Sequence, residues 1–192
     1  LLVVSDGTTS ARFIAAELIG QAEHSPDTCC VLVTTSRTQA EEVAGELEAQ
    51  TKGAERADII RKALTSNGAL LVADSVDDAF AFVNAFGAEH LTVSMRHAVE
   101  SLKKIRSAGS VFLGEYSPVA IGDYGIGPNA ILPTYGEACR RGGLAANTFV
   151  KTISYQMLSK EGLEQVAPTA TTLARVENLP AHLRSIEVRL GP

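Results

Sequence analysis

The sequence lacks the features of several large protein classes. It has no dense run of basic residues, and its formal charge is −5, from 17 Lys and Arg against 22 Asp and Glu. Because nucleic-acid phosphates are bound by clustered Lys and Arg, we expect no nucleic-acid partner. The apolar runs are far too short to span a bilayer, so we expect no membrane partner either.

Cysteines and glycine motifs are also scarce. The three cysteines do not pair evenly, and Cys29 and Cys30 are adjacent. We therefore expect reduced, buried thiols in a cytoplasmic protein. No Cys-x-x-Cys spacing indicates a thiolate zinc site. No Gly-x-Gly-x-x-Gly follows an expected strand, and "GIGPNA" is only a weak match, so a dinucleotide fingerprint is absent.

The sequence does contain a regular alternation of apolar runs and helical patterns. Val-, Leu- and Thr-rich runs predict strands over 1–6, 29–36, 69–75, 90–95 and 109–115. Helical periodicity predicts helices over 9–23, 38–50, 54–66, 76–89 and 98–108. This order predicts an α/β fold, a Rossmann-like, mainly parallel sheet with flanking helices. Since residue 1 already lies in a strand pattern, we expect a piece of a longer protein.

The character of the chain changes after the last expected strand. Residues 117–143 are rich in Gly and Pro without a sustained period, which predicts a long ordered loop of functional importance. We expect two helices over 146–179 and a short tail over 180–192. The domain prediction is therefore an α/β portion over 1–145 and a C-terminal helical arm and tail over 146–192.

Few polar groups are candidates for chemistry. Gln21 and His24 are three residues apart at an expected helix end, which fits a shared face or merely a solvated edge. Glu89 and His90 pair a carboxylate with an imidazole, which fits general base chemistry or a His stabilised by a helix dipole. Asp123, between glycines, fits a metal ligand or a turn.

Taken together and in order, these stretches resemble one family, the histidinol dehydrogenases, over its C-terminal part. The matching stretches are "QAEHSPD", "GAEHL", "SAGSVFLGEYSP", "GDYGIGPN", "LPTYG", "SKEGLE" and "LPAH". Members are zinc-dependent enzymes that oxidise L-histidinol to L-histidine through the aldehyde, with two NAD⁺. The resemblance implies that this chain is a fragment, inactive alone, and that the NAD-binding domain lies outside it.

The resemblance also implies residue roles. Gln21, His24, Asp123 and His182 match the zinc ligands, and the catalytic pair is Glu89, which activates water, and His90, the general base. Substrate contacts are implied for Gln21, His24, His90, Asp123, Glu177 and His182. In the family the tail that carries the last histidine comes from the partner subunit. An exchanged C-terminal arm in a homodimer is therefore expected.

One position departs from the family pattern. Ala130 stands where biosynthetic members typically have a histidine beside the active site, and a methyl group cannot donate, accept or carry charge. Two alternatives therefore stay open. The first is a paralogue that oxidises a different small primary alcohol with the same zinc and Glu/His machinery. The second is a non-catalytic dimerisation or regulatory module, against which the retained ligand and catalytic positions argue.

Overall fold

The structure is a computed structural model that describes residues 1–191. The chain divides into two compact units, Leu1–Ala146 and Asn147–Pro192. Each unit is described by itself. None of the described helices is both long enough and apolar enough to cross a membrane.

The first unit is built on one parallel sheet of five strands. The strands are β1 (Leu2–Ser5), β2 (Cys30–Thr34), β3 (Gly68–Val72), β4 (Ala88–Ser94) and β5 (Ala108–Leu113). Their order is β3-β2-β1-β4-β5, and each neighbouring pair is parallel. The expected α/β fold with a mainly parallel sheet is confirmed.

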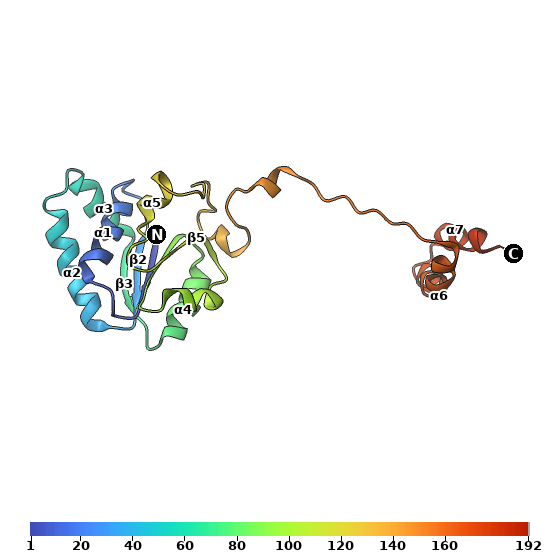
Figure 1. The fold of residues 1–192 in the computed structure, drawn as a ribbon, viewed down its shortest axis with the longest axis horizontal. Coiled ribbons are helices and arrows are strands. Elements are labelled where there is room, and N and C mark those ends of the chain that lie inside the picture. Colours follow the sequence, from blue (N-terminus) through green and yellow to red (C-terminus); the bar gives the residue numbers. More distant parts are fainter. Residues whose placement is uncertain (192) are drawn as a thin grey trace. The chain divides into compact units, whose positions relative to one another are not determined.

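Helices cover both faces of this sheet. The helices α1 (Ala11–Ala22), α2 (Arg37–Thr51) and α3 (Ala57–Asn67) lie on one side, and α4 (Val76–Phe86) lies on the other (Figure 1). Alternate strand residues serve the two sides. Val3 and Leu32 pack towards α1, whereas Leu2, Val4 and Leu91 pack towards α4. Burial from both faces explains why these strands read as continuous apolar runs.

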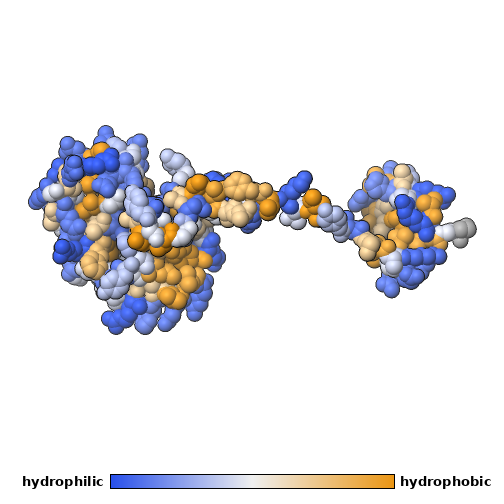
Figure 2. Space-filling model, turned by 45° about the horizontal axis from the view of Figure 1, so that its top comes forward, coloured by the Kyte–Doolittle hydropathy of each residue, from blue (hydrophilic) through white to orange (hydrophobic). Residues whose placement is uncertain are grey.

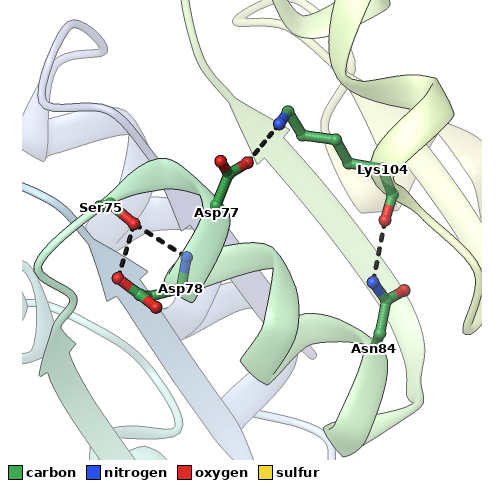
Figure 3. A network of polar contacts seen from close by, with 5 residues as sticks. All are labelled: Ser75, Asp77, Asp78, Asn84 and Lys104. Carbon is green, nitrogen blue, oxygen red and sulfur yellow. Dashed lines mark hydrogen bonds and ion pairs between the residues drawn. The ribbon is translucent and has the colours of Figure 1, made fainter.

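A polar network fastens α4 to the segment that precedes β5. Asn84 donates to the Lys104 carbonyl at 2.9 Å and accepts from the Arg106 and Ser107 amides at 2.7 and 3.2 Å. Lys104 also pairs with Asp77 (Figure 3). The segment itself is a 3-10 helix, η1 (Ala98–Lys104), rather than the α-helix expected over 98–108. Three hydrogen bonds from this segment to one asparagine side chain fix where β5 begins.

The long Gly- and Pro-rich segment contains more regular structure than expected. It forms a short helix, α5 (Val119–Tyr124), and a 3-10 turn, η2 (Glu137–Cys139). The η2 turn packs where α4 ends at Gly87, whose φ is +60°. A Cβ on Gly87 would lie 2.5 Å from the Cys139 sulfur, so only glycine allows this close approach.

The second unit differs from its prediction. The expectation of a helix early in 146–179 is wrong. After a 3-10 turn, η3 (Ala146–Phe149), the chain has no regular structure until α6 (Lys160–Val176). The expected tail is instead a helix, α7 (Pro180–Leu190). Pro180 explains the second difference, because a proline at the first helical position is already set to a helical φ.

Candidate active site and metal-binding residues

His90 lies inside β4, with its imidazole on the side of the sheet that α1 covers. The strand residue opposite it is Ser110, and its ring centroid is 6.1 Å from that of Phe112. His90 is only 8% exposed, and its Nδ1 makes no hydrogen bond to any residue that the structure describes. The Nδ1 atom is therefore not used by hydrogen bonds within the described residues and can bind a proton or a ligand.

Burial also sets the protonation of His90. Desolvation lowers the pKa of this imidazole, and the carboxylates of Glu89 and Asp123 oppose the shift. The net direction is downward, so the ring is neutral at pH 7 and has a lone pair to accept a proton. The structure therefore gives His90 the protonation state that a general base needs.

Glu89 is placed differently from its neighbour. Successive strand residues point to opposite faces, so Glu89 and His90 leave β4 on opposite sides of the sheet. The Glu89 carbonyl is packed against Gly109, where a Cβ would lie only 2.6 Å from that oxygen. Glu89 lines neither of the two cavities described next. The catalytic pair predicted from the sequence is thus adjacent along the strand but not in one cavity.

The first cavity lies beside His90, between β5 and the loop that follows α5. It has a volume of about 190 Å³ and is lined by His90, Asp123, Ser117, Asn129 and Ala130 together with apolar side chains. Asp123 reaches it because α5 packs directly on the sheet. A Cβ on Gly122 would lie 2.7 Å from the Phe112 ring, so the missing side chain permits this approach.

The second cavity joins the remaining candidates of the first unit. It has a volume of about 440 Å³, and Gln21, His24 and Asp123 all line it. Asp123 and Ser117 line both cavities. Because α1 ends at Ala22, His24 lies just beyond the helix, where its amide bonds the Gln21 carbonyl at 3.3 Å. Gln21 and His24 therefore meet at one cavity through the chain leaving α1, not through a shared helix face.

These three side chains offer a donor set that fits zinc. An amide oxygen, an imidazole and a carboxylate are nitrogen and oxygen ligands of the kinds that Zn²⁺ accepts, and three of them leave a position open. Among residues 1–191, no group of three or more His, Cys, Asp or Glu side chains is arranged to hold a metal. Of the three candidate ligands, only His24 and Asp123 are of those types, since Gln21 is an amide.

One polar residue at this site was missed by the sequence analysis. Glu17 of α1 lines the second cavity, and its Oε1 accepts hydrogen bonds from the Val119 amide at 2.7 Å and the Thr92 hydroxyl at 3.1 Å. Burial raises the pKa of Glu17, while these two hydrogen bonds lower it. The only signal in the sequence was a carboxylate one helical turn before Gln21.

The remaining two candidates belong to the second unit. Glu177 is the residue that caps the end of α6, and His182 is the third residue of α7. Both are exposed. The structure therefore brings together Gln21, His24, His90 and Asp123, and it presents Glu177 and His182 on the surface of a separate unit.

Comparisons with known proteins give the family. The family model described as histidinol dehydrogenase matches residues 1–190. The histidinol dehydrogenase of Methanocaldococcus jannaschii is 44% identical over 190 residues, which are 99% of this chain and 44% of that protein. That of Vibrio parahaemolyticus is 42% identical over 99% of this chain.

A solved structure agrees with these relatives. The crystal structure of histidinol dehydrogenase from Elizabethkingia anophelis matches with a TM-score of 0.91 and 36% identity, over 98% of this chain and 43% of that one. The chain thus spans less than half the length of the relatives it matches. With a family model covering nearly all of it, the chain belongs to the histidinol dehydrogenase family.

Proposed function

We propose that the chain is the C-terminal part of an enzyme that oxidises L-histidinol to L-histidine through the aldehyde, with two NAD⁺ as hydride acceptors. The observation that carries the proposal is that His90, Gln21 and His24 line two cavities joined by Asp123, which lines both. These four side chains come from α1, the turn after it, β4 and α5. A fold that conserved only its scaffold would have no reason to gather a buried base and three metal-type donors.

His90 is the proposed general base. The alcohol oxygen of the substrate gives its proton to the neutral imidazole as hydride leaves the adjoining carbon, which yields the aldehyde. Water then adds to the aldehyde. The hydrate loses a second proton to the same ring as the second hydride leaves, which yields the carboxylic acid, and this acid then loses a proton to water to give the carboxylate. Between the two steps His90 must release its first proton to solvent, and its lowered pKa favours that release.

Gln21, His24 and Asp123 are the proposed zinc ligands in the first unit, and His182 of a second copy is the proposed fourth. When bound, zinc supplies a Lewis acid that orients and polarises a polar group of the substrate. Neutral imidazole and ionised carboxylate are the forms in which His24 and Asp123 would bind it.

Glu89 is the proposed activator of the water that attacks the aldehyde. The support for this role is the family motif and the position of Glu89 next to His90, not a shared cavity. Glu89→Gln should therefore leave the alcohol–aldehyde step largely intact and slow the conversion of aldehyde to carboxylate. Transient kinetics with the alcohol and then with the aldehyde as substrate separates the two steps, and equal loss in both would contradict this role.

We further propose a homodimer in which the arm formed by residues 147–191 contributes His182 and Glu177 to the partner's site. Both side chains are exposed on the second unit, where a second copy can reach them. Many large apolar side chains of this unit are exposed as well (Figure 2). A surface of this kind is typical of a segment that packs on another subunit.

The test of the proposed activity uses the full-length protein loaded with zinc. Excess NAD⁺ is added to L-histidinol, and the NADH formed per histidinol consumed is counted. Two NADH per molecule are expected for the four-electron oxidation. Absence of NADH from folded, metal-bound protein would contradict L-histidinol as substrate. A folded dimer that binds no zinc and reduces no NAD⁺ with any alcohol would favour the non-catalytic module instead.

A second candidate function has one specific observation in its favour. Ala130 lines the cavity beside His90, together with Ile126 and Leu132. An apolar wall here suits a substrate side chain other than imidazole. We propose as the alternative a different small primary alcohol, oxidised by the same residues. If Ala130 adapts the pocket to a different alcohol, Ala130→His should raise kcat/KM for L-histidinol and lower it for that alcohol.

A further inference from the structure

The Glu17 side chain links α1 to both β4 and α5 by hydrogen bonds. It belongs to α1, one turn before Gln21. One of its two carboxylate oxygens, Oε1, accepts hydrogen bonds from two elements that are distant in the sequence. The Thr92 hydroxyl comes from β4, two residues after His90, and the Val119 amide is the first of α5. One carboxylate therefore connects the three elements that carry His90, Asp123 and Gln21.

The bond to Val119 matters because α5 cannot hold itself in place. The helix has only six residues, and isolated helices of that length are not stable in water. Its cap position is Pro118, which makes no side-chain capping bond. The Glu17 carboxylate takes over that task from another helix, and Asp123 follows Val119 by one helical turn.

Neighbouring contacts leave α5 dependent on this bond. Gly122 lets the helix lie against Phe112, but the residues before it, Glu115 and Tyr116, are exposed. Only Val119 of α5 is buried in the core. Without the carboxylate the buried Val119 amide would lack its partner, and the start of α5 would have to move towards water.

We propose that Glu17 is a positioning residue that holds α5, and with it Asp123, in fixed register with Gln21 and His90. The effect of Glu17 on zinc affinity rests on the proposed function, in which Asp123 is a zinc ligand. Glu17 itself is not proposed as a ligand. It acts on the metal through the place it gives to Asp123, as outer hydrogen-bond partners commonly do in metal sites.

The test measures two properties of the full-length protein, zinc affinity and hydrogen exchange of the peptide that contains residues 117–124. Glu17→Ala should weaken zinc binding by roughly tenfold or more, the usual effect of removing an outer partner. Exchange of the Val119 amide should accelerate by a similar factor, about tenfold, because a charge-assisted bond is lost. Glu17→Gln keeps an acceptor oxygen and should restore both properties.

Two further variants make the result specific. Glu48→Ala removes a comparable carboxylate from the exposed ion pair with Lys52 on α2, and it should change neither property. Val119→Pro removes the amide that donates to Glu17 and replaces the buried Val119 side chain by a ring of similar size. Proline is tolerated at this first helix position, and the ψ of 150° at Pro118 suits a following proline. This variant should reproduce the loss of zinc affinity even if Glu17→Ala fails to fold.

The two proposals fail in different ways. If wild-type protein binds zinc and folded Glu17→Ala and Val119→Pro bind it equally well, the positioning role is overturned while the proposed function stands. If exchange of residues 117–124 is unchanged in both variants, the role is overturned as well. If wild-type protein binds no zinc, the proposed function fails, and the exchange comparison still decides whether Glu17 holds α5.

Discussion

The two units of this chain bury their apolar residues very differently. In the first unit, large side chains from both faces of the sheet are fully buried, among them Leu2, Leu32 and Leu91. Among the described residues of the second unit, only the small Ala167 and Ala174 are buried, and many larger apolar side chains are exposed, among them Val166, Leu173, Val176, Leu179 and Val188. The first unit has a core of its own, and the second does not.

This difference shows that helical periodicity alone does not make a stable unit. The periodic patterns of α1 and α6 are both visible in the sequence, but only α1 has a sheet to pack on. The helices α6 and α7 are joined by an ion pair between Arg175 and Glu187 at 3.5 Å, but few of their side chains are buried to offset the entropy of ordering them. The proposed exchange of this arm between subunits would supply the missing surface.

The largest effect is expected from a complementation experiment between the two units. In the full-length protein, His90→Asn in the first unit and His182→Asn in the second should each abolish activity. If the arm completes the partner's site, a heterodimer of the two variants has one intact site. Random mixing should then restore about a quarter of wild-type activity. Subunits are mixed by reversible denaturation, and NADH formation is measured.

The outcome discriminates sharply between the two arrangements. No activity in a mixture shown to contain heterodimers would mean that each arm serves its own subunit. A mixture of His90→Asn with His24→Asn is the matched control. Both residues lie in the first unit, so every heterodimer should remain inactive.

A smaller effect is expected from truncating one leucine in each unit. Leu18 is 1% exposed in the core beneath α1, and Leu18→Ala should lower the free energy of unfolding of the first unit by about 3 kcal/mol. Leu173 is 55% exposed on α6, and Leu173→Ala should cost less than about 0.5 kcal/mol in the 192-residue chain. Urea titrations with hydrogen exchange resolve the two units.

The same pair of variants tests whether a second subunit covers α6 in the proposed full-length dimer. There Leu173→Ala should become costly and should weaken dimerisation, whereas the Leu18→Ala cost should not depend on protein concentration. A large cost of Leu173→Ala in the 192-residue chain would instead show that α6 already packs on a core within the chain.

The smallest effect is expected for the reactivity of the three cysteine thiols, which lie in the core and on the surface of the first unit. The expectation of buried thiols is confirmed for Cys30 in β2 and wrong for Cys29 and Cys139, which are exposed. Burial raises the pKa of the Cys30 thiol to about 11. The thiols of Cys29 and Cys139 should react with a disulfide reagent at pH 8, and that of Cys30 only after the protein unfolds. Rapid reaction of all three in folded protein would contradict the burial of Cys30.

The raised pKa of Cys30 also predicts a pH dependence of stability. The folded thiol keeps its proton up to about pH 11, whereas the unfolded thiol loses it from its ordinary value of 9.0. The unfolded state therefore binds fewer protons between these values, and stability should fall as pH rises through this window. A Cys30→Ala variant should lack this part of the fall.

Much of the fold was predictable because its signals are local. Five apolar runs separated by helical patterns gave the parallel sheet, and capping serines such as Ser36 and Ser75 mark where α2 and α4 begin. The prediction failed in the arm, where the apolar and β-branched residues of 150–159 resemble a helical stretch but form no regular structure. It also failed at α7, where Pro180 begins a helix that was expected to be a tail.

The sequence by itself determined the family motifs and therefore the identity of the candidate site residues. Only the tertiary structure decided which of them meet. It buried His90, separated Glu89 onto the other face of β4, and joined Glu17 to Thr92 and Val119, which are 75 and 102 positions away. The physical reason is range. Propensity and periodicity act over one helical turn or one strand, whereas contacts between distant residues exist only after the sheet has set its strand order.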